Sequence, residues 1–330
     1  MTPQDPSPQN ARVCAALDWD PFAPSLQIEP LVTLPHSFVA RISHPDHAHG
    51  TPMIFKQAGS PDFASGMRKE LVVNRDVLSQ FSTPVGPAFV SGDEKAQLPW
   101  ILFADVALDH APASTQPPPR SQIEQFIVAL ATTHTQARAL PLADLFQDVE
   151  GDVRITDGAE FIPDVLDAFL HEVGEDRFPA RCRELVAGIR DNTPLVARLL
   201  SGDETLVHGD AHFGNALYDS TGALLIDWAL AVIGPGEADL THALAMNLPR
   251  LLSEAYEESL FRTYAETCSQ LGHATGLDDV RDRYRRCLLV TLIIAVGMRT
   301  VPGMADQVWS YMFTNAVHAA LDHDVLELLR

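Results

Sequence analysis

The sequence predicts an α+β protein in which a small antiparallel β-sheet precedes a mostly helical C-terminal part. Residues 26–104 contain short apolar runs of strand length, whereas from residue 121 onward apolar residues recur at the three- and four-residue spacing of helices. A polar segment at 207–228 also has the pattern of a short strand followed by a β-hairpin. We therefore expect a flexible N-terminal segment at 1–24, a sheet lobe at 25–104 and a helical lobe at 105–330.

Four apolar runs are expected to form the strands of the sheet lobe. The runs at 26–33 and 37–43 are joined by a short loop and are typical of a hairpin. A third run occupies 53–56, and a fourth occupies 98–105. Between the last two, Ser60 and Pro61 favour a helix start, because serine caps helices and proline is tolerated in the first turn.

The polar segment has a geometry that follows from its sequence. Apolar runs at 215–218 and 223–226 flank the turn-forming residues Asp-Ser-Thr-Gly, so antiparallel pairing outward from this loop is expected. That pairing places Asn215 beside Asp227 at the open end of the hairpin. Asp210 lies on the loop that leads into it, so two carboxylates and one amide oxygen converge.

Oxygen ligands of this kind suit magnesium, which usually takes one or two carboxylates together with phosphate and water. A binuclear metallophosphoesterase is a weaker interpretation of the same residues. That fold needs Asn followed by His and further histidine ligands, whereas Asn215 is followed by Ala216.

This segment follows the spacing of the protein-kinase catalytic loop. It reads His208-Gly209-Asp210, four further residues and then Asn215, and Asp227 ends the next strand. The segment resembles the aminoglycoside phosphotransferase and choline kinase superfamily, whose pattern is H-G-D-x-H-x-x-N followed by a strand ending in Asp. The resemblance implies a two-lobed protein-kinase-like fold. It implies that Asp210 and His208 are catalytic, with Asp210 as base and His208 bracing the loop, and that Asn215 and Asp227 bind Mg²⁺.

The same resemblance gives roles to residues of the sheet lobe. Lys56, at the end of its strand, would bind the nucleotide phosphates. It is one of only three lysines in the chain. Glu70, two turns into the following helix, would pair with Lys56, with Asp76 as the fallback. Phe103 and Ala104 would form the hinge that meets the adenine.

The loop that would cover the phosphates, residues 34–37, contains no glycine, although protein kinases have a glycine-rich loop there. We expect Ser37 to take part in nucleotide binding through its backbone and hydroxyl group. In the helical lobe, Asp239 would tie the helix that follows it to the catalytic loop. His134 lies on an apolar helical face and is expected to be a buried structural residue.

The net charge of −21 is unevenly distributed, since residues 106–330 hold 33 of the 44 acidic residues and 16 of the 23 basic ones. An acidic surface attracts cations and repels nucleic acid. This favours a small cationic acceptor such as an amine or amino sugar and argues against a nucleic-acid partner. Possible contributors are Glu254, Glu257, Glu258, Asp322 and Asp324.

No signal peptide or membrane span is apparent, and the four cysteines have no paired spacing. We therefore expect a cytoplasmic protein without a membrane partner, and the sequence leaves its oligomeric state open. The predicted function is ATP-dependent transfer of the γ-phosphate to a hydroxyl of a small molecule, with ATP and Mg²⁺ as cofactors. The alternatives are a nucleotide-binding pseudokinase or regulatory module, and a kinase of a neutral sugar or metabolite.

Overall fold

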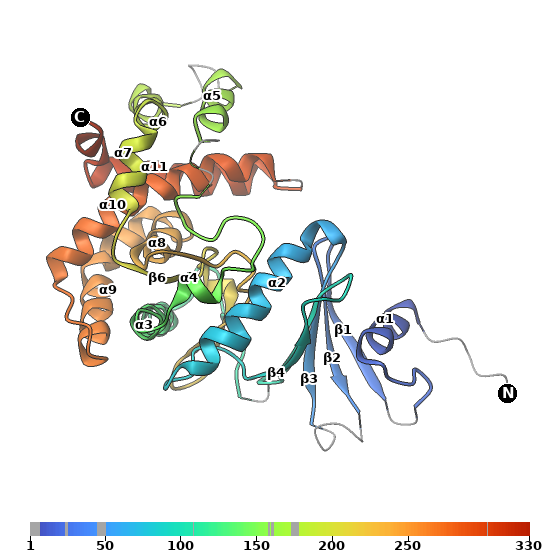
Figure 1. The fold of residues 1–330 in the computed structure, drawn as a ribbon. Helices are drawn as coiled ribbons and strands as arrows, with labels where there is room; N and C mark the ends of the chain where they lie inside the picture. Colours follow the sequence, from blue (N-terminus) through green and yellow to red (C-terminus); the bar gives the residue numbers. More distant parts are fainter. Residues whose placement is uncertain are drawn as a thin grey trace.

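The computed structural model describes residues 7–23, 26–44, 51–107, 109–157, 159, 162–172, 178–301 and 303–330. A sheet-containing N-terminal part lies beside a larger helical part (Figure 1). This mixed α+β architecture confirms the predicted two-lobed, protein-kinase-like fold class.

The N-terminal part is built on a five-stranded antiparallel sheet with the order β1-β2-β3-β5-β4. The strands are β1 (Gln27–Thr33), β2 (Ser37–Ser43), β3 (Met53–Ala58), β4 (Phe89–Asp93) and β5 (Trp100–Ala104). The first two strands occupy almost the same residues as the predicted hairpin. Because side chains alternate between the two faces of a strand, each face of the sheet has its own apolar cluster.

Helix α1 (Pro8–Leu17) packs on one face of the sheet, where Val13 joins Phe38, Phe55 and Leu102 in a buried cluster. Helix α2 (Ala64–Val72) packs on the other face through Met67 and Leu71 and continues as a π-helical turn (Val73–Val77).

Helix α1 lies within the segment for which we expected flexibility. Our expectation was therefore wrong for residues 8–17, because Val13 and Cys14 bury apolar surface against the sheet lobe. Residues 1–6 and 24 lie outside the described part of the chain.

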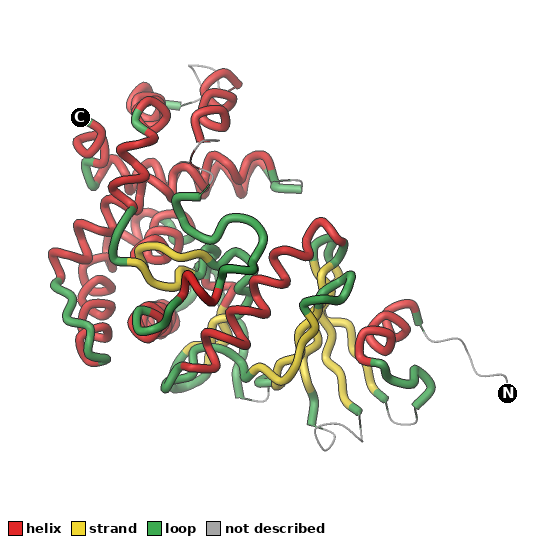
Figure 2. Tube along the Cα trace, viewed as in Figure 1, coloured by secondary structure: helices red, strands yellow, loops and turns green. Residues whose placement is uncertain are grey.

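The C-terminal part is mostly helical (Figure 2). Its helices are α3 (Arg120–Ala137), α4 (Leu142–Leu145), α5 (Ile162–Glu172), α6 (Ala180–Asp191), α7 (Thr193–Leu200), α8 (Glu237–Thr241), α9 (Arg250–Gln270), α10 (Leu277–Gly297) and α11 (Asp306–Asp322). Their apolar faces form one large core. Among the described residues, no helix combines the length and apolar character needed to cross a lipid bilayer.

Two small β-ribbons lie between α7 and α8 in the sequence and carry the polar segment. Strand β6 (Glu204–Val207) pairs with β9 (Val232–Pro235), and β7 (Ala216–Tyr218) pairs with β8 (Ala223–Leu225). These ribbons deliver the polar residues to the junction between the sheet and the helical part.

Candidate active site

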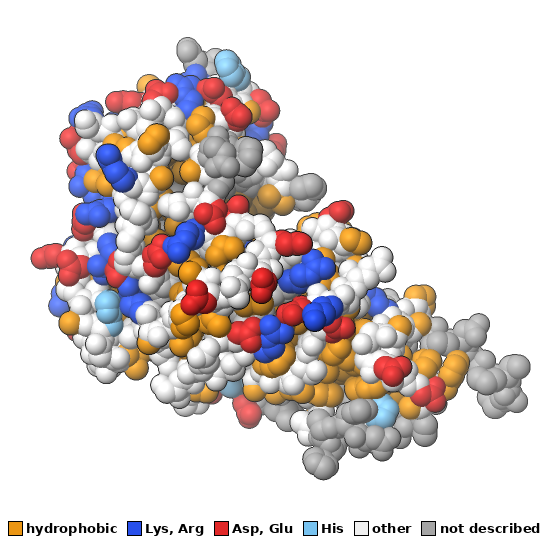
Figure 3. Space-filling view, in the orientation of Figure 1, with side chains coloured by type: hydrophobic (Ala, Val, Ile, Leu, Met, Phe, Trp, Pro, Cys, Tyr) orange, Lys and Arg blue, Asp and Glu red, His pale blue; other side chains and the backbone are white. Residues whose placement is uncertain are grey.

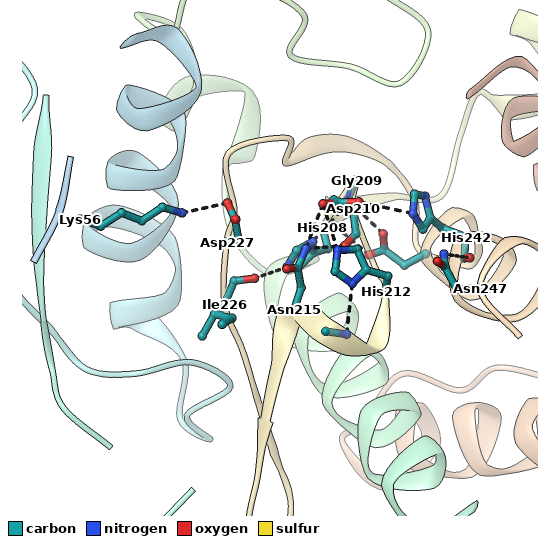
Figure 4. A network of polar contacts seen from close by, with 12 residues as sticks. Lys56, His208, Gly209, Asp210, His212, Asn215, Ile226, Asp227, His242 and Asn247 are labelled. Carbon is teal, nitrogen blue, oxygen red and sulfur yellow. Dashed lines mark hydrogen bonds and ion pairs between the residues drawn. The ribbon is translucent and has the colours of Figure 1, made fainter. Parts of the chain in front are cut away.

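A cavity of about 570 Å³ separates the sheet from the β7–β8 hairpin. Its wall includes Lys56 and Glu70 from the sheet lobe and Ile226 and Asp227 from the hairpin. Figure 4 shows Lys56 reaching from its strand toward Asp227, with Asp210 and Asn215 grouped on the other side of Asp227. Lys56 and Asp227, which are expected to bind phosphate and metal, therefore face the same cavity from its two walls.

Lys56 forms the ion pair with Glu70 that the sequence predicted. Its Nζ atom lies 2.7 Å from Oε2 of Glu70 and 2.9 Å from Oδ1 of Asp227. Burial would lower the pKa of Lys56, but the two carboxylates outweigh burial and raise it, so the ammonium group stays charged. The fallback residue Asp76 instead pairs with Arg75 at 2.7 Å.

Alternation along β3 explains why Lys56 meets Glu70. Phe55 faces α1, whereas Lys56 and Ile54 face the side of the sheet that α2 covers. Glu70 is fully buried on α2, where an unpaired carboxylate would be costly. The ion pair thus fixes the position of a cation at the cavity wall.

A buried carboxylate on α8 holds the backbone of the catalytic loop. Oδ2 of Asp239 accepts a hydrogen bond from the His208 backbone at 2.7 Å, and Oδ1 accepts one from the Gly209 backbone at 3.1 Å. His134 lies 2.9 Å from Oδ2 of Asp239 and 2.8 Å from the Tyr264 hydroxyl. His134 is fully buried, and Asp239 contacts the loop as the sequence suggested.

The His208 side chain links the catalytic loop to the hairpin. Its Nε2 atom lies 2.9 Å from the carbonyl oxygen of Ile226, the residue before Asp227, and its ring packs against Trp228. Burial lowers the pKa of His208, which favours the neutral ring. Nε2 then donates to the carbonyl, and we interpret His208 as a positioning residue.

Gly209 occupies a position that other residues would strain. Its φ angle is +80°, and a Cβ atom there would lie 2.0 Å from the carbonyl oxygen of Leu230. Both the left-handed backbone and the close contact require glycine. This accounts for Gly209 at the place where the protein-kinase pattern has arginine.

Asp210 lies at the centre of a polar cluster. Its carboxylate accepts a 3.0 Å hydrogen bond from the Asn215 amide, and histidine nitrogens of His212 and His242 lie 3.5 Å from its two oxygens. Burial would raise the pKa of Asp210, but the interactions with His242, His212 and His208 outweigh burial and hold it well below its usual range. The side chain is 31% exposed and is therefore a carboxylate that solvent can reach.

The β7–β8 hairpin has the register deduced from the sequence. Ala216 pairs with Leu225 and Tyr218 with Ala223, and Ile226 donates its N–H to the carbonyl of Asn215 at 2.9 Å. Asn215 and Asp227 consequently leave the open end of the hairpin as neighbours. Asp227 has a φ angle of +66°, an uncommon conformation for a residue other than glycine.

These two residues offer one amide oxygen and one carboxylate. The described residues contain no cluster of three or more His, Cys, Asp or Glu side chains suited to a metal. A metal that retains water and phosphate ligands needs no such cluster, so the donor set fits Mg²⁺ better than a cation held entirely by protein groups.

The loop at 34–37 closes tightly without a glycine of its own. The N–H of Gly59, after β3, donates to the carbonyl of His36 at 2.9 Å. A Cβ atom at Gly59 would lie 2.0 Å from the carbonyl oxygen of Pro35. The glycine that permits the close approach therefore lies opposite the loop. Ser37, for which we expected a part in nucleotide binding, lines the cavity.

Phe103 and Ala104 also line the cavity, at the end of β5. The N–H of Ala104 already donates to the carbonyl of Ala88 at 2.9 Å. Ala104 therefore has only its carbonyl left to offer a purine edge. Asp105, the next residue, pairs with Arg41 of β2 at 2.6 Å and fixes the hinge to the sheet.

His242 is a site residue that the sequence analysis missed. It opens a π-helical turn (His242–Met246) directly after α8, and Figure 4 shows its ring directed toward Asp210. The sequence separates it from Asp210 by a ribbon and a helix. In the sequence, the only feature that could have pointed to His242 as a site residue was its position three residues after Asp239.

Three solved structures illustrate the fold. The wild-type aminoglycoside 2′-phosphotransferase-IIIa in its GDP complex is 13% identical, with a TM-score of 0.58 over 97% of this chain and 99% of that one. A choline/ethanolamine kinase family protein from Mesorhizobium loti is 14% identical, with a TM-score of 0.60 over 97% and 96%. Macrolide 2′-phosphotransferase from Brachybacterium faecium is 12% identical, with a TM-score of 0.58 over 93% and 98%.

No curated protein matches the chain. A family model, described as the phosphotransferase enzyme family, matches residues 37–277, which include β2, β3, the catalytic loop and the hairpin. The sequence resemblance and the geometry of the cleft agree with this match. The chain belongs to the phosphotransferase enzyme family.

Proposed function

We propose that the protein transfers the γ-phosphate of ATP to a hydroxyl group of a small molecule, with Mg²⁺. The observation that carries the proposal is the position of Lys56 between Glu70 and Asp227, because it joins a buried cation to the expected metal ligand across the cleft. Lys56, Ser37, Phe103 and Ala104 would bind the nucleotide. Asn215 and Asp227 would hold Mg²⁺.

The contacts of Asp210 suggest how it acts. A carboxylate with a pKa held this low is a weak base, so it would accept a hydrogen bond from the acceptor hydroxyl long before it took the proton. Phosphoryl transfer depends mainly on positioning and charge neutralisation. Bound Mg²⁺ would supply charge neutralisation at the phosphates. Asp210 would orient the hydroxyl, and His208 and Asp239 would hold the loop that carries it.

A pseudokinase is the weaker alternative. It was suggested by the glycine-free loop at 34–37, but Gly59 gives that loop its close packing from the opposite side. Lys56 and Asp227 line one cleft, and Asp210 and Asn215 lie beside Asp227. These observations support turnover rather than nucleotide binding alone.

The acceptor is proposed to be a small amine or amino-sugar type of compound, on the basis of the acidic charge of the helical part. The acidic residues that the sequence analysis gave as possible contributors lend this proposal little support. Glu257 pairs with Arg250, Glu258 pairs with Arg281, and Asp322 pairs with Arg250. On the face drawn in Figure 3, acidic and basic side chains are intermingled. These carboxylates therefore have cations of their own.

A nucleotide-consumption screen tests the proposed function. Purified protein is incubated with Mg-ATP or Mg-GTP and with panels of amines, amino sugars, antibiotics and neutral sugars. Turnover that requires Mg²⁺ and is lost in Asp210→Asn would support phosphotransfer. Nucleotide binding without turnover across all panels would favour the pseudokinase.

A further inference from the structure

A second cavity, of about 510 Å³, lies in the helical part beside the catalytic loop. Its walls come from α5, α7 and α10, the segment at 152–159 and the residues that precede β9. Gly209 of the catalytic loop and His242 contribute to its lining, whereas Lys56 and Asp227 line only the cleft described above. Asp210 lines neither cavity, but its neighbour Gly209 and its contact His242 place it next to the second one.

The walls of this second cavity are mostly apolar. Half-buried or exposed side chains from four segments line it, namely Ile155, Val165, Leu230, Val232, Ile293 and Ile294. Leu230 is 58% exposed although its backbone packs against Gly209. Apolar side chains that stay accessible around a cavity can gain free energy by contacting an apolar ligand.

Three of the four charged residues in the lining contact other protein groups through their side chains. Arg154 pairs with Glu204, and the carboxylate of Asp157 accepts hydrogen bonds from the backbone N–H groups of Val153 and Arg154. Asp239 is fully buried and bonded to the catalytic loop. Arg154 is thus paired with a carboxylate and Asp239 is occupied by the catalytic loop, whereas Asp152 and Asp157 are exposed.

One polar side chain in the lining lacks hydrogen bonds. His242 is 4% exposed, and neither of its ring nitrogens makes a hydrogen bond within the described part of the chain. Its Nε2 atom lies 3.5 Å from Oδ1 of Asp210, longer than a good hydrogen bond. A buried polar group without a partner is costly, so a bound hydroxyl at this point would be stabilising.

We propose that the second cavity binds the apolar body of the phosphate acceptor, whose hydroxyl reaches Asp210 past His242. The acceptor class is then an amphipathic alcohol with several contiguous carbon atoms. This assignment rests on the proposed phosphotransfer function, because it places the acceptor beside Asp210. It narrows the amine or amino-sugar expectation to compounds with a substantial apolar part.

Methyl, butyl and hexyl β-glucosides test the cavity, because they share one polar head and differ only in alkyl length. Dissociation constants are measured by ligand-observed NMR on the full chain below micellar concentrations. We expect affinity to rise by up to about fourfold for each buried methylene. Equal affinities for the three glucosides would overturn the proposal.

The variants Leu230→Asp and Ile293→Asp test whether the alkyl chain binds in the second cavity. Both place a charge in the apolar lining at accessible side chains, so both should abolish the chain-length dependence. Leu251→Asp is the matched control, since Leu251 is 81% exposed on α9 and lines neither cavity. It should leave the dependence unchanged. A chain-length effect that survives both cavity variants would place the alkyl group elsewhere and overturn the proposal.

Nucleotide binding in the same samples separates this proposal from the proposed function. Lys56→Met should lose nucleotide affinity and retain the alkyl chain-length effect. A wild-type protein that binds the glucosides as described but no nucleotide would contradict the proposed function alone. A protein that binds and turns over nucleotide without a chain-length effect would contradict only the acceptor assignment.

Discussion

The ammonium group of Lys56 lies 2.9 Å from a carboxylate oxygen of Asp227, although 171 residues separate them in the sequence. The contact crosses the cleft between the sheet and the β7–β8 hairpin. It brings a cation that is expected to bind phosphate together with a proposed metal ligand. The sheet wall and the hairpin wall of the cleft are thus linked by charge attraction.

Replacing Lys56 should remove the cation at the nucleotide phosphates. We expect Lys56→Met to lower kcat/KM for nucleotide by on the order of 10²-fold, the effect of losing one preorganised charge contact. Steady-state kinetics measure this effect. Lys95→Met is the control, because Lys95 is exposed in the loop after β4 and should behave like wild type. Equal kinetics for the two variants would remove Lys56 from the site.

Asp227 should be needed for the metal-dependent part of nucleotide binding. We expect Asp227→Ala to bind nucleotide with the same affinity in the presence and absence of Mg²⁺, because its carboxylate is the charged donor beside Asn215. Calorimetry with ATP, with and without chelator, measures the difference. A variant whose affinity still responds to Mg²⁺ as wild type does would show that the metal is held elsewhere.

Asp210 should act on the acceptor rather than on the nucleotide. We expect Asp210→Asn and Asp210→Ala to lower kcat by about 10²- to 10⁴-fold, the range for loss of a positioned acid–base group. Nucleotide affinity, measured by calorimetry, should change little. Near-normal turnover on the true acceptor would rule out this role.

Gly209 offers a prediction about stability. We expect Gly209→Ala to lower the free energy of unfolding by about 1–3 kcal/mol, because the left-handed backbone and the Leu230 carbonyl both exclude a Cβ atom. Gly222→Ala, in the hairpin loop, meets no atom within 4 Å and should change stability by less. Urea denaturation of the two variants makes the comparison, and equal midpoints would contradict it.

The four cysteine thiols should resist modification in the folded protein. All four are free and buried, and burial raises the pKa of Cys182 to about 11. Since the thiolate is the reactive form, a raised pKa leaves almost no reactive species at pH 8. A disulfide-exchange reagent should therefore react slowly with native protein and rapidly with four thiols after denaturation. Fast reaction of any thiol in the native protein would contradict the burial of that residue.

The sequence predicted those parts of the site that depend on local geometry. The register that places Asn215 beside Asp227 followed from loop length and strand pairing alone. The Lys56–Glu70 pair was implied by the family resemblance together with the order of a strand and a helix, and the structure adds Asp227 as a second carboxylate beside Lys56. Such relationships need few residues and little tertiary information.

Relationships between distant segments were not predictable in this way. Gly59 supports the loop at 34–37 only because β3 ends opposite it, and His242 approaches Asp210 only because α8 and its π-helical turn cross the catalytic loop. Helix α1 was overlooked because its sequence is polar and proline-rich at the start, whereas its stability comes from the buried contact of Val13 with the sheet. Each outcome depends on packing rather than on periodicity.

The hydrogen bonds of Asp239 also bear on how the protein would lose activity when heated. Through His134 and Tyr264, this carboxylate connects the catalytic loop to α3 and α9, whose apolar faces belong to the large helical core. The sheet has separate apolar clusters with α1 and α2. Fraying at the outer strands of the sheet would therefore leave the catalytic loop intact. Activity would instead be lost at the temperature at which the helical core unfolds.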